Sequence, residues 1–357
     1  MDKFKQDLEH SKHQIDQRIA VVSTELLSDT KNTYGERYSD ILAAYVDVLG
    51  RGGKRLRGVL AQHSYEFHGG KDTGVGLEAA VIIEMLHDYL LVVDDVEDVS
   101  TLRRGKPAAH ILLENYHQEH HLAGDQAHYG VSQAINAALA GQNLALSRAL
   151  KLPVSDAAKV AASAHLNGFL TKTCFGQLGD FNNEAFETSK EEDVVQVLKL
   201  KTAYYTFCMP VYFGAALAGR GISPELNDYL LNAGISFQLY DDIIGTFGEV
   251  EQTGKSNRSD IIEGKRTLLV VYALERATSE QKTALAQALG NKNLTDDEFE
   301  AARQAIKNTG ALERCQAEVQ RLTEQAKKSI NQASSLPPGA TEFFTRLVDY
   351  VAEHTKV

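Results

Sequence analysis

Tryptophan is absent from the 357-residue sequence, and proline and cysteine are scarce, with six and three residues. Cys174, Cys208 and Cys315 form no CxxC pair, and this odd, scattered set excludes a disulfide framework and a zinc ribbon. No apolar run reaches the roughly 18 residues of a membrane span, so we expect no transmembrane segment. The N-terminal segment is charged and lacks the apolar core of a signal peptide. These absences together predict a reducing, cytoplasmic location.

Basic residues are also too few for one class of partner. The 37 Lys and Arg stand against 48 Asp and Glu, which gives a formal net charge of −11. A general nucleic-acid binder needs a basic face, so we expect no nucleic-acid partner. The length alone would suggest about two domains. Because no Gly/Ser/Pro linker and no internal repeat divides the chain, we predict one domain over residues 1–357.

Apolar residues recur at three- and four-residue spacing along most of the chain, which indicates helices. Strictly alternating runs of β-branched residues are absent, so the pattern predicts an all-α fold. Ser155 and Thr295 are expected N-caps, the latter in a capping box with Glu298. We expect a motif-bearing core at about 40–275 and a more charged, amphipathic helical appendage at 295–357. The predicted helices of the core are 77–93, 132–150, 155–178, 191–218, 224–247 and 267–289.

Two clusters of carboxylates end apolar helical runs. Asp94, Asp95 and Asp98 form the sequence DDVED, in which the first and last are four residues apart and share a helical face. Like charges this close raise each other's pKa unless a cation neutralises them, and Mg²⁺ does so with one or two carboxylates plus phosphate oxygens. A solvated acidic helix end would explain one cluster equally well. The second pair, Asp241 and Asp242, favours the metal: we expect both clusters to face one cavity.

Basic side chains flank these carboxylates: Lys54, Arg57, Arg103, Arg104, Lys201, Lys255 and Lys265. Arginine binds phosphate through its planar fork and lysine as a point charge. A surface salt bridge is the commoner role for each cation alone, although Lys201 lies in an otherwise apolar helix. His87 precedes Asp94 by two helical turns and should point toward the same cavity, with a core histidine as the alternative. The histidines of 117–121 favour a loop between helices over a metal site.

Seven short motifs occur in a fixed order along the chain: GGKRLRG (52–58), DDVED (94–98), LRRGKP (102–107), LKT (200–202), FQLYDD (237–242), GK (254–255) and EGKRT (263–267). In this order and spacing they resemble a known family, the trans-isoprenyl diphosphate synthases (polyprenyl synthetases), from about residue 40 to 275. The resemblance implies an all-α fold with helices surrounding a central cavity, usually in a homodimer. It also implies Mg²⁺-dependent, head-to-tail condensation of isopentenyl diphosphate with an allylic diphosphate.

The family's roles transfer to matching positions of this sequence. The resemblance assigns the isopentenyl diphosphate site to Lys54, Arg57, His87 and Arg104. It assigns the Mg²⁺ clusters to Asp94, Asp95 and Asp98 and to Asp241 and Asp242. The allylic diphosphate is assigned to Arg103, Lys201, Thr202, Gln238, Lys255 and Lys265. The residues implied in catalysis are Asp94, Asp95, Asp98, Arg103, Lys201 and Asp241.

The sequence departs from the family pattern at two positions of its motifs. Gly245 stands where many members have a third aspartate, and Gln142 replaces an aspartate. The insert at 117–131 is similar to that of some geranylgeranyl diphosphate synthases. Tyr89, with Leu90 beside it, lies five residues or about 7.5 Å of helix before Asp94, and we expect it to floor the chain pocket. The pattern favours geranylgeranyl diphosphate as product, with farnesyl and longer diphosphates as alternatives.

Two other classes stay open. Terpene cyclases share the DDxxD motif and the helical bundle, but they lack the GGKRxR and RRGKP elements because they bind one diphosphate. A non-catalytic subunit of a heterodimeric synthase usually loses an aspartate cluster, whereas both are present here.

Overall fold

The computed structural model describes residues 3–187, 190–248 and 257–353, and nearly all of them are helical. The chain divides into two compact units, which are described separately. Unit 1 contains Met1–His165 and Pro210–Gly221, and unit 2 contains Leu166–Met209 and Ile222–Val357. The all-α prediction is confirmed, while the single domain stays a prediction. Among the described helices, none combines the length and the apolarity that a membrane crossing requires.

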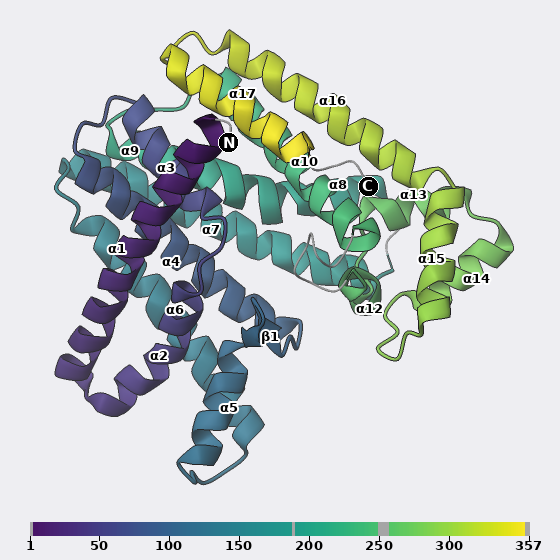
Figure 1. Cartoon of the computed structure of the whole chain (residues 1–357), viewed down its shortest axis with the longest axis horizontal. Helices are drawn as coiled ribbons and strands as arrows, with labels where there is room; N and C mark the ends of the chain where they lie inside the picture. The colour runs from purple at the N-terminus through teal and green to yellow at the C-terminus, as the bar shows by residue number, and fades with distance from the viewer. Residues whose placement is uncertain (1–2, 188–189, 249–256, 354–357) are drawn as a thin grey trace. The chain divides into compact units, whose positions relative to one another are not determined.

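Unit 1 is built around the apolar helix α4 (Figure 1). Tyr45 is fully buried and donates a hydrogen bond to the Met85 carbonyl of α4, over 2.8 Å. A Cβ at Gly141 would lie 2.4 Å from the Tyr45 ring, so only glycine permits this approach. The elements are α1 (Lys3–Tyr34), α2 (Glu36–Gly50), α3 (Leu56–Phe67), α4 (Thr73–Glu97), β1 (Leu102–Arg103), β2 (Lys106–Pro107), α5 (Ala109–Glu119), α6 (Gln126–Leu150), the start of α7 (Asp156–Ala185) and nearly all of α9 (Met209–Leu217).

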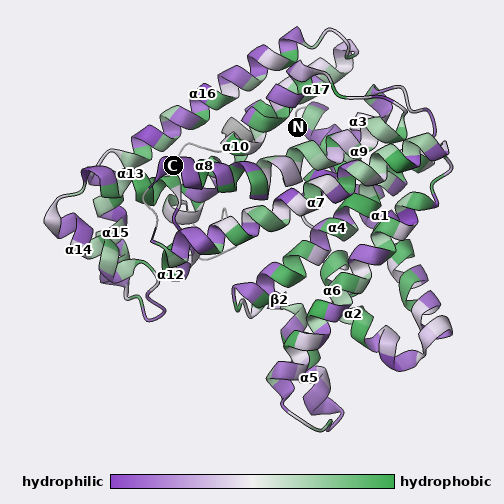
Figure 2. Cartoon of the chain, turned by 180° about the vertical axis from the view of Figure 1, so that it is seen from behind, coloured by the Kyte–Doolittle hydropathy of each residue, from purple (hydrophilic) through white to green (hydrophobic). Residues whose placement is uncertain are grey.

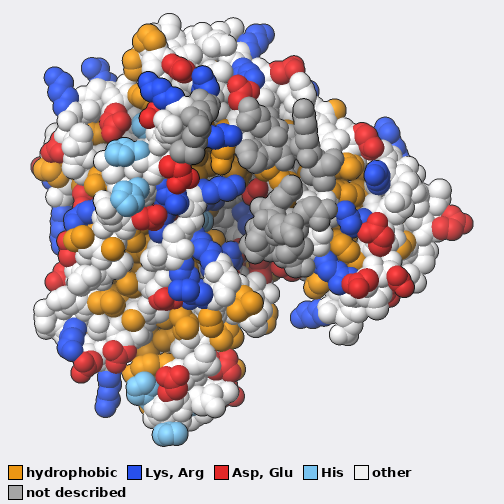
Figure 3. All heavy atoms as spheres, viewed as in Figure 1, with side chains coloured by type: hydrophobic (Ala, Val, Ile, Leu, Met, Phe, Trp, Pro, Cys, Tyr) orange, Lys and Arg blue, Asp and Glu red, His pale blue; other side chains and the backbone are white. Residues whose placement is uncertain are grey.

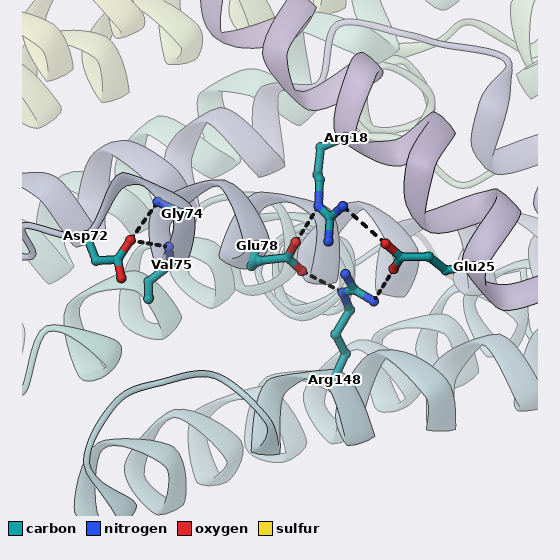
Figure 4. Close-up of polar contacts among 7 residues, drawn as sticks. All are labelled: Arg18, Glu25, Asp72, Gly74, Val75, Glu78 and Arg148. Carbon is teal, nitrogen blue, oxygen red and sulfur yellow. Dashed lines mark hydrogen bonds and ion pairs between the residues drawn. The ribbon is translucent and has the colours of Figure 1, made fainter. Parts of the chain in front are cut away.

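A network of four charged side chains joins α1, α4 and α6 (Figure 4). Glu78 of α4 accepts from Arg18 Nε at 2.5 Å and from Arg148 Nε at 2.6 Å. Glu25 accepts from the other end of both guanidinium groups, at 3.3 Å each. Asp72, the N-cap of α4, accepts from the Gly74 amide at 2.9 Å. These contacts hold the first helix against the apolar one that carries the aspartate motif.

Unit 2 packs its helices around the apolar side chains of α10, among them Leu239, Ile243 and Phe247. Helices α16 and α17 cover this helix, and α16 alternates polar and apolar bands along its length (Figure 2). Helix α16 is therefore amphipathic, while the separation of a core from a C-terminal appendage stays a prediction. The elements are the remainder of α7, α8 (Glu191–Val197), the π-helix η1 (Leu198–Cys208), α10 (Pro224–Phe247), α12 (Ser259–Glu263), α13 (Leu268–Arg276), α14 (Ser279–Ala288), α15 (Asp296–Asn308), α16 (Ala311–Gln332) and α17 (Pro338–Glu353).

Most predicted helices are present, with one clear error. Helix α10 matches the predicted 224–247, and Ser155 and Thr295 cap their helices as expected. The predicted helix 267–289 is wrong, because it is two helices, α13 and α14. Thr278 breaks it by closing a capping box with Gln281, which starts α14 afresh.

Three further segments differ from the simple helical reading. The predicted helix 191–218 is helical throughout, but its middle is η1, whose wider turns are typical of functional sites. Residues 102–107 form a small antiparallel hairpin. The expected loop at 117–121 is partly wrong, because α5 continues to Glu119 and buries His117 in its last turn. Histidine side chains lie at the surface near the tip of α5 (Figure 3).

Candidate functional site

The first aspartate motif lies at the C-terminal end of α4. The Asp98 amide donates to the Asp94 carbonyl at 2.8 Å, so the helical turn continues through the motif. Asp94 and Asp98 therefore share one face, as predicted. The side chain of Asp94 is 28% exposed, whereas that of Asp95 is fully buried. The three carboxylates thus differ in environment, and only the outer two lie on the face that reaches solvent.

The buried carboxylate of Asp95 forms an ion pair with Arg103. Its Oδ1 accepts from Arg103 Nε at 2.8 Å and from the same guanidinium's Nη2, which also lies 3.4 Å from Asp94 Oδ2. Burial raises the pKa of Asp95, and the Arg103 guanidinium opposes that rise. Arg103 is itself 10% exposed, so it has one fixed position. The predicted metal ligand Asp95 therefore holds the predicted diphosphate ligand Arg103 in place.

The hairpin that carries Arg103 and Arg104 is held by Arg51, a residue for which the sequence motifs predict no role. Its guanidinium donates to the carbonyls of Arg103 at 2.9 Å and Pro107 at 2.8 Å. Arg104 and Gly105 form the tip with φ angles of 53° and 73°, in the left-handed region. Arg51 thus anchors both strands of the hairpin, and Arg104 and Gly105 make the turn between them.

The glycine-rich segment 52–58 brings a loop close to that hairpin tip. A Cβ at Gly53 would lie 3.1 Å from Arg104 Nη2, so the loop backbone lies directly against the guanidinium. Helix α3 begins at Leu56, and Lys54 precedes it. Lys54 therefore projects from the loop, whereas Arg57 lies in the first turn of the helix.

Arg55, between these two residues, is a structural group. It is 3% exposed and reaches Asp16 Oδ1 at 2.8 Å, the Leu49 carbonyl at 2.8 Å and Glu84 Oε2 at 3.2 Å. It therefore fixes the loop from which Lys54 projects.

The His87 ring contacts Arg57, with His87 Nε2 3.4 Å from Arg57 Nη1. Arginine only donates, so Nε2 must be the accepting nitrogen of a neutral ring. Burial and the charges of Arg57 and Arg104 hold the pKa of His87 well below its usual range. The ring thus stays neutral at pH 7 and can donate only through Nδ1.

Asp88, next along α4, is a buried acid that sequence reasoning missed. Its side chain is among the most buried of the described charged groups, and neither carboxylate oxygen has a hydrogen-bond partner among the described residues. Burial raises the pKa of Asp88 to about 8, against the opposing charge of Arg104. Asp88 is therefore mostly protonated at pH 7, since its neutral form is the one that burial favours.

The second aspartate pair, in unit 2, belongs to a chain of polar contacts. Gln238 Nε2 donates to Asp242 Oδ1 at 2.8 Å, and Thr202 Oγ1 donates to Gln238 Oε1 at 2.7 Å. Burial and the neighbouring carboxylate of Asp260 raise the pKa of Asp242 to about 8. Thr202 of one predicted motif therefore contacts Gln238 and, through it, Asp242 of another, and Asp241 lies next to Asp242 on the same helix.

Lys201 is held by an acid that the motifs did not reveal. Its Nζ lies 2.6 Å from Asp180 Oδ2, with both side chains about a quarter exposed. A Cβ at Gly176 would lie 2.5 Å from the Lys201 amide, so α7 packs directly against η1. Asp180 belongs to none of the sequence motifs. Only the packing of α7 against η1 identifies it as the partner of Lys201. Lys265 contacts Glu263 at 2.7 Å and Asp260 at 3.8 Å, while Lys255 lies outside the described residues.

The comparison with known sequences identifies the family. The polyprenyl synthetase sequence pattern matches residues 39–306, which is well over half of the chain.

The chain belongs to the polyprenyl synthetase family.

Individual relatives of this polyprenyl synthetase agree with that result. It is 33% identical to the geranylgeranyl diphosphate synthase of Saccharolobus solfataricus over 78% of this chain and 79% of the relative. It is 29% identical to a short chain isoprenyl diphosphate synthase of Methanocaldococcus jannaschii over 79% and 80%. A solved geranylgeranyl pyrophosphate synthase of Corynebacterium glutamicum, complexed with isoprenyl diphosphate and magnesium, superposes with a TM-score of 0.88 at 29% identity, covering 96% and 99%. The predicted enzyme class, a transferase of prenyl groups, is confirmed.

Synthases of this family use divalent metal ions, and the residues present fit such an ion. Among the described residues, no three His, Cys, Asp or Glu side chains form a ready-made metal site. A hard divalent ion needs only one or two protein carboxylates when water and phosphate oxygens complete its shell. Asp94 and Asp98 provide one such pair. In the second motif, a Cβ at Gly245 would lie 2.8 Å from Asp260 Oδ2, so a further carboxylate lies against this helix.

The two residues predicted to set product length lie on α4 as expected. Tyr89 is 8% exposed and Leu90 is half-buried, one to two turns before Asp94. Tyr89 is thus part of the packed interior of unit 1, and its effect on product length stays a prediction.

Proposed function

We propose that this protein condenses isopentenyl diphosphate with an allylic diphosphate to form geranylgeranyl diphosphate. The observation that carries the proposal is Arg103, which is fixed by Asp94 and Asp95 beside the solvent-facing end of α4. A permanently charged fork and a carboxylate within 3.4 Å of it can bind a diphosphate directly and through a cation. A structural ion pair would need neither the third aspartate nor the adjoining basic hairpin.

In unit 1, the proposed isopentenyl diphosphate ligands are Lys54, Arg57, His87 and Arg104. Three of these ligands are cations and can neutralise the diphosphate. His87 is neutral and can only donate a hydrogen bond. The packing of Gly53 against Arg104 keeps the loop and the hairpin tip together. This arrangement binds a diphosphate without supplying a base or a nucleophile.

The proposed allylic diphosphate ligands are Arg103, Lys201, Thr202, Gln238, Lys255 and Lys265. The proposed metal-binding residues are Asp94, Asp95, Asp98, Asp241 and Asp242. Bound Mg²⁺ would neutralise diphosphate charge and so favour departure of the leaving group. Asp180 orients Lys201 through their 2.6 Å ion pair, and Gln238 orients Asp242.

The reaction needs no covalent intermediate with the protein. The allylic carbon–oxygen bond breaks, and its electron pair leaves with pyrophosphate. The double bond of isopentenyl diphosphate then forms the new carbon–carbon bond, and a proton is lost to the departing pyrophosphate. The fixed cations Arg103 and Lys201 stabilise the negative charge that develops, which is the largest contribution a protein makes in such a step.

The product length rests on Tyr89 and Leu90. Curated relatives include a geranylfarnesyl diphosphate synthase of Aeropyrum pernix and a nonaprenyl diphosphate synthase of Rhodobacter capsulatus, so family membership does not set chain length. A buried aromatic ring one and a half turns before Asp94 would stop a growing chain early. If the Tyr89 ring stopped the chain one prenyl unit earlier, the product would be farnesyl diphosphate.

The decisive assay supplies Mg²⁺ and isopentenyl diphosphate with dimethylallyl, geranyl or farnesyl diphosphate separately. Chromatography should show geranylgeranyl diphosphate from each allylic substrate. Tyr89→Ala should give longer products, whereas the control Leu91→Ala, on the same helix α4, should not. Unchanged lengths in Tyr89→Ala would place the floor elsewhere. Turnover of the allylic substrate alone would indicate a cyclase, and absence of pyrophosphate release would indicate a non-catalytic subunit.

The proposal includes a cytoplasmic homodimer. Helix α6 exposes Ile135 and Leu139, with 36% and 43% of their surface open to solvent. Apolar side chains one turn apart on an exposed face are typical of a helix that meets a partner. Light scattering behind size exclusion should therefore give twice the 39.2 kDa chain mass.

A further inference from the structure

Three acids of α4, Glu84, Asp88 and Asp95, lie on one stripe of the helix. They follow one another by four and seven residues, which is the spacing of a single helical face. The two outer acids each bind an arginine: Arg55 Nη1 lies 3.2 Å from Glu84 Oε2, and Arg103 Nε donates to Asp95 Oδ1 at 2.8 Å. Asp88, between them, is 1% exposed, and neither of its carboxylate oxygens has a hydrogen-bond partner among the described residues. The middle acid of the stripe therefore lacks the partner that both of its neighbours have.

Two segments of the chain cover this stripe and meet above its middle. The Gly58 amide donates to Glu84 Oε1 at 2.8 Å, so the loop before α3 lies against one end of the stripe. The hairpin 102–107 lies against the other end, through the ion pair of Arg103. The loop and the hairpin contact each other where a Cβ at Gly53 would lie 3.1 Å from Arg104 Nη2. This junction brings Arg104 to the part of the stripe that Asp88 occupies.

Arg104 is the arginine at this junction that is left for Asp88. Arg51 already donates to two hairpin carbonyls, and Arg55 is bound to Glu84 and to two further oxygens. Arg104 is exposed and makes no hydrogen bond and no ion pair with the described residues. Burial raises the pKa of Asp88 and lowers that of Arg104, and in each case the other group is the strongest charge opposing the shift. An acid and an arginine, both without a partner, therefore lie next to each other.

We propose that Asp88 is a positioning residue for the isopentenyl diphosphate site, which controls how much of the Arg104 charge is available to the diphosphate. This inference rests on the proposed function, because Arg104 is a proposed ligand of that diphosphate. Neutral Asp88 leaves the guanidinium to the substrate, whereas ionised Asp88 forms an ion pair with it. Asp88 is shielded from solvent and acts only through Arg104.

The protonation of Asp88 therefore links substrate binding to pH. Burial raises the pKa of Asp88 to about 8 against the charge of Arg104, so the acid is mostly neutral at pH 7 and mostly ionised at about pH 9. Bound diphosphate takes the guanidinium away from Asp88 and adds negative charge nearby. Both effects favour the neutral acid, so binding near pH 8 should take up protons.

The other charged and titratable groups around Asp88 come from three elements. Burial holds the pKa of Tyr45 well above its usual range and that of His87 well below it, so both stay neutral between pH 7 and about pH 9. Arginine stays charged over the same range. The groups are Glu84 and His87 of α4, Tyr45 of α2, Arg51 and Arg55 before α3, and Arg104 of the hairpin.

The test follows the KM for isopentenyl diphosphate against pH, with Mg²⁺ and an excess of geranyl diphosphate. In the unmodified chain this KM should rise about tenfold between pH 7 and about pH 9, because a charged hydrogen-bond donor is withdrawn from the diphosphate. Asp88→Asn, which resembles the neutral acid, should match the unmodified chain at pH 7 and lack the rise. The control Asp29→Asn, the same charge change at an exposed position of α1, should follow the unmodified chain throughout.

Two further readouts separate positioning from a structural role. Calorimetry of isopentenyl diphosphate binding, in buffers of different ionisation enthalpy near pH 8, should show more proton uptake in the unmodified chain than in Asp88→Asn. The urea midpoint of Asp88→Asn should be unchanged or higher, because the variant removes a buried acid that has no partner. A structural hydrogen-bonding role would instead lower the midpoint and leave the pH profile of the KM unchanged.

Identical pH profiles of the KM in the unmodified chain and in Asp88→Asn would overturn the inference while leaving the proposed function intact. If that variant does not fold, absence of proton uptake when the unmodified chain binds isopentenyl diphosphate overturns it equally. The proposed function fails separately if the unmodified chain releases no pyrophosphate from its two substrates at any pH.

Discussion

The substitution Glu78→Gln tests how much the charge network of Figure 4 contributes to the stability of unit 1. Glu78, Arg148 and Arg18 have side chains that are 19%, 21% and 28% exposed, so water screens them only in part. A hydrogen bond to a charged group contributes roughly 1.5–3 kcal/mol, and Glu78 accepts two. The glutamine keeps one acceptor oxygen but loses the charge, so we expect a loss of about 2 kcal/mol in the free energy of unfolding.

Urea unfolding at pH 7, followed by circular dichroism, measures this loss. With a slope of about 3 kcal/mol per M, the midpoint should fall by about 0.7 M. The matched control is Glu36→Gln, which removes the carboxylate of an exposed ion pair with Lys31. It should leave the midpoint unchanged, since exposed pairs contribute little.

The stability lost in Glu78→Gln should depend on pH in a defined direction. Burial raises the pKa of Glu78, but the hydrogen bonds and charges of Arg148 and Arg18 outweigh it and leave the pKa below its ordinary value. A depressed pKa contributes stability that is present above the unfolded value of about 4.3 and lost as the pH falls through the folded one. The difference between the two proteins should therefore shrink below about pH 4. A midpoint shift no larger than that of Glu36→Gln, or one independent of pH, would refute the reasoning.

Three other outcomes follow from the structure. Lys201→Ala should lower kcat by about 100-fold or more in steady-state kinetics, with little change in the Mn²⁺ affinity. The control Lys199→Ala, on the same π-helix, should leave kcat unchanged. Gly214→Ala should destabilise the fold by about 1–3 kcal/mol in urea, because its Cβ would lie 2.3 Å from the Ala61 carbonyl oxygen; an unchanged midpoint would mean that α3 and α9 separate freely. Chelation by EDTA should abolish pyrophosphate release and Mg²⁺ should restore it, and activity that survives chelation would contradict a metal-dependent reaction.

The sequence predicts features that depend on residues close together in the chain, such as the ends of helices. Helix α10 begins at Pro224 and ends at Phe247, as its apolar spacing and the preceding Ser223 cap indicate. The capping box at Thr295 and Glu298 was readable for the same reason, since both hydrogen bonds lie within four residues. The same signal at Thr278 and Gln281 was overlooked, and it divides the predicted helix 267–289.

Contacts between distant residues could not be predicted in this way. The carboxylates Asp180 and Asp260 carry no motif of their own, and each became visible only through the partner that packing brings to it. Likewise, Asp95 looks like its neighbour Asp94 in the sequence, but burial gives its carboxylate to Arg103.

The scarcity of cysteine and of basic residues, together with the helical spacing and the aspartate and arginine motifs, determined the fold class, the family and the chemical character of the ligands. Those properties depend on residue type and on spacing within a few turns, which the linear chain contains. The tertiary structure alone decided which carboxylate holds Arg103, which acid orients Lys201 and which carboxylate occupies the space beside Gly245. Each of these depends on the packing of separate helices, because a charge acts over a few ångströms of space rather than over positions in the sequence.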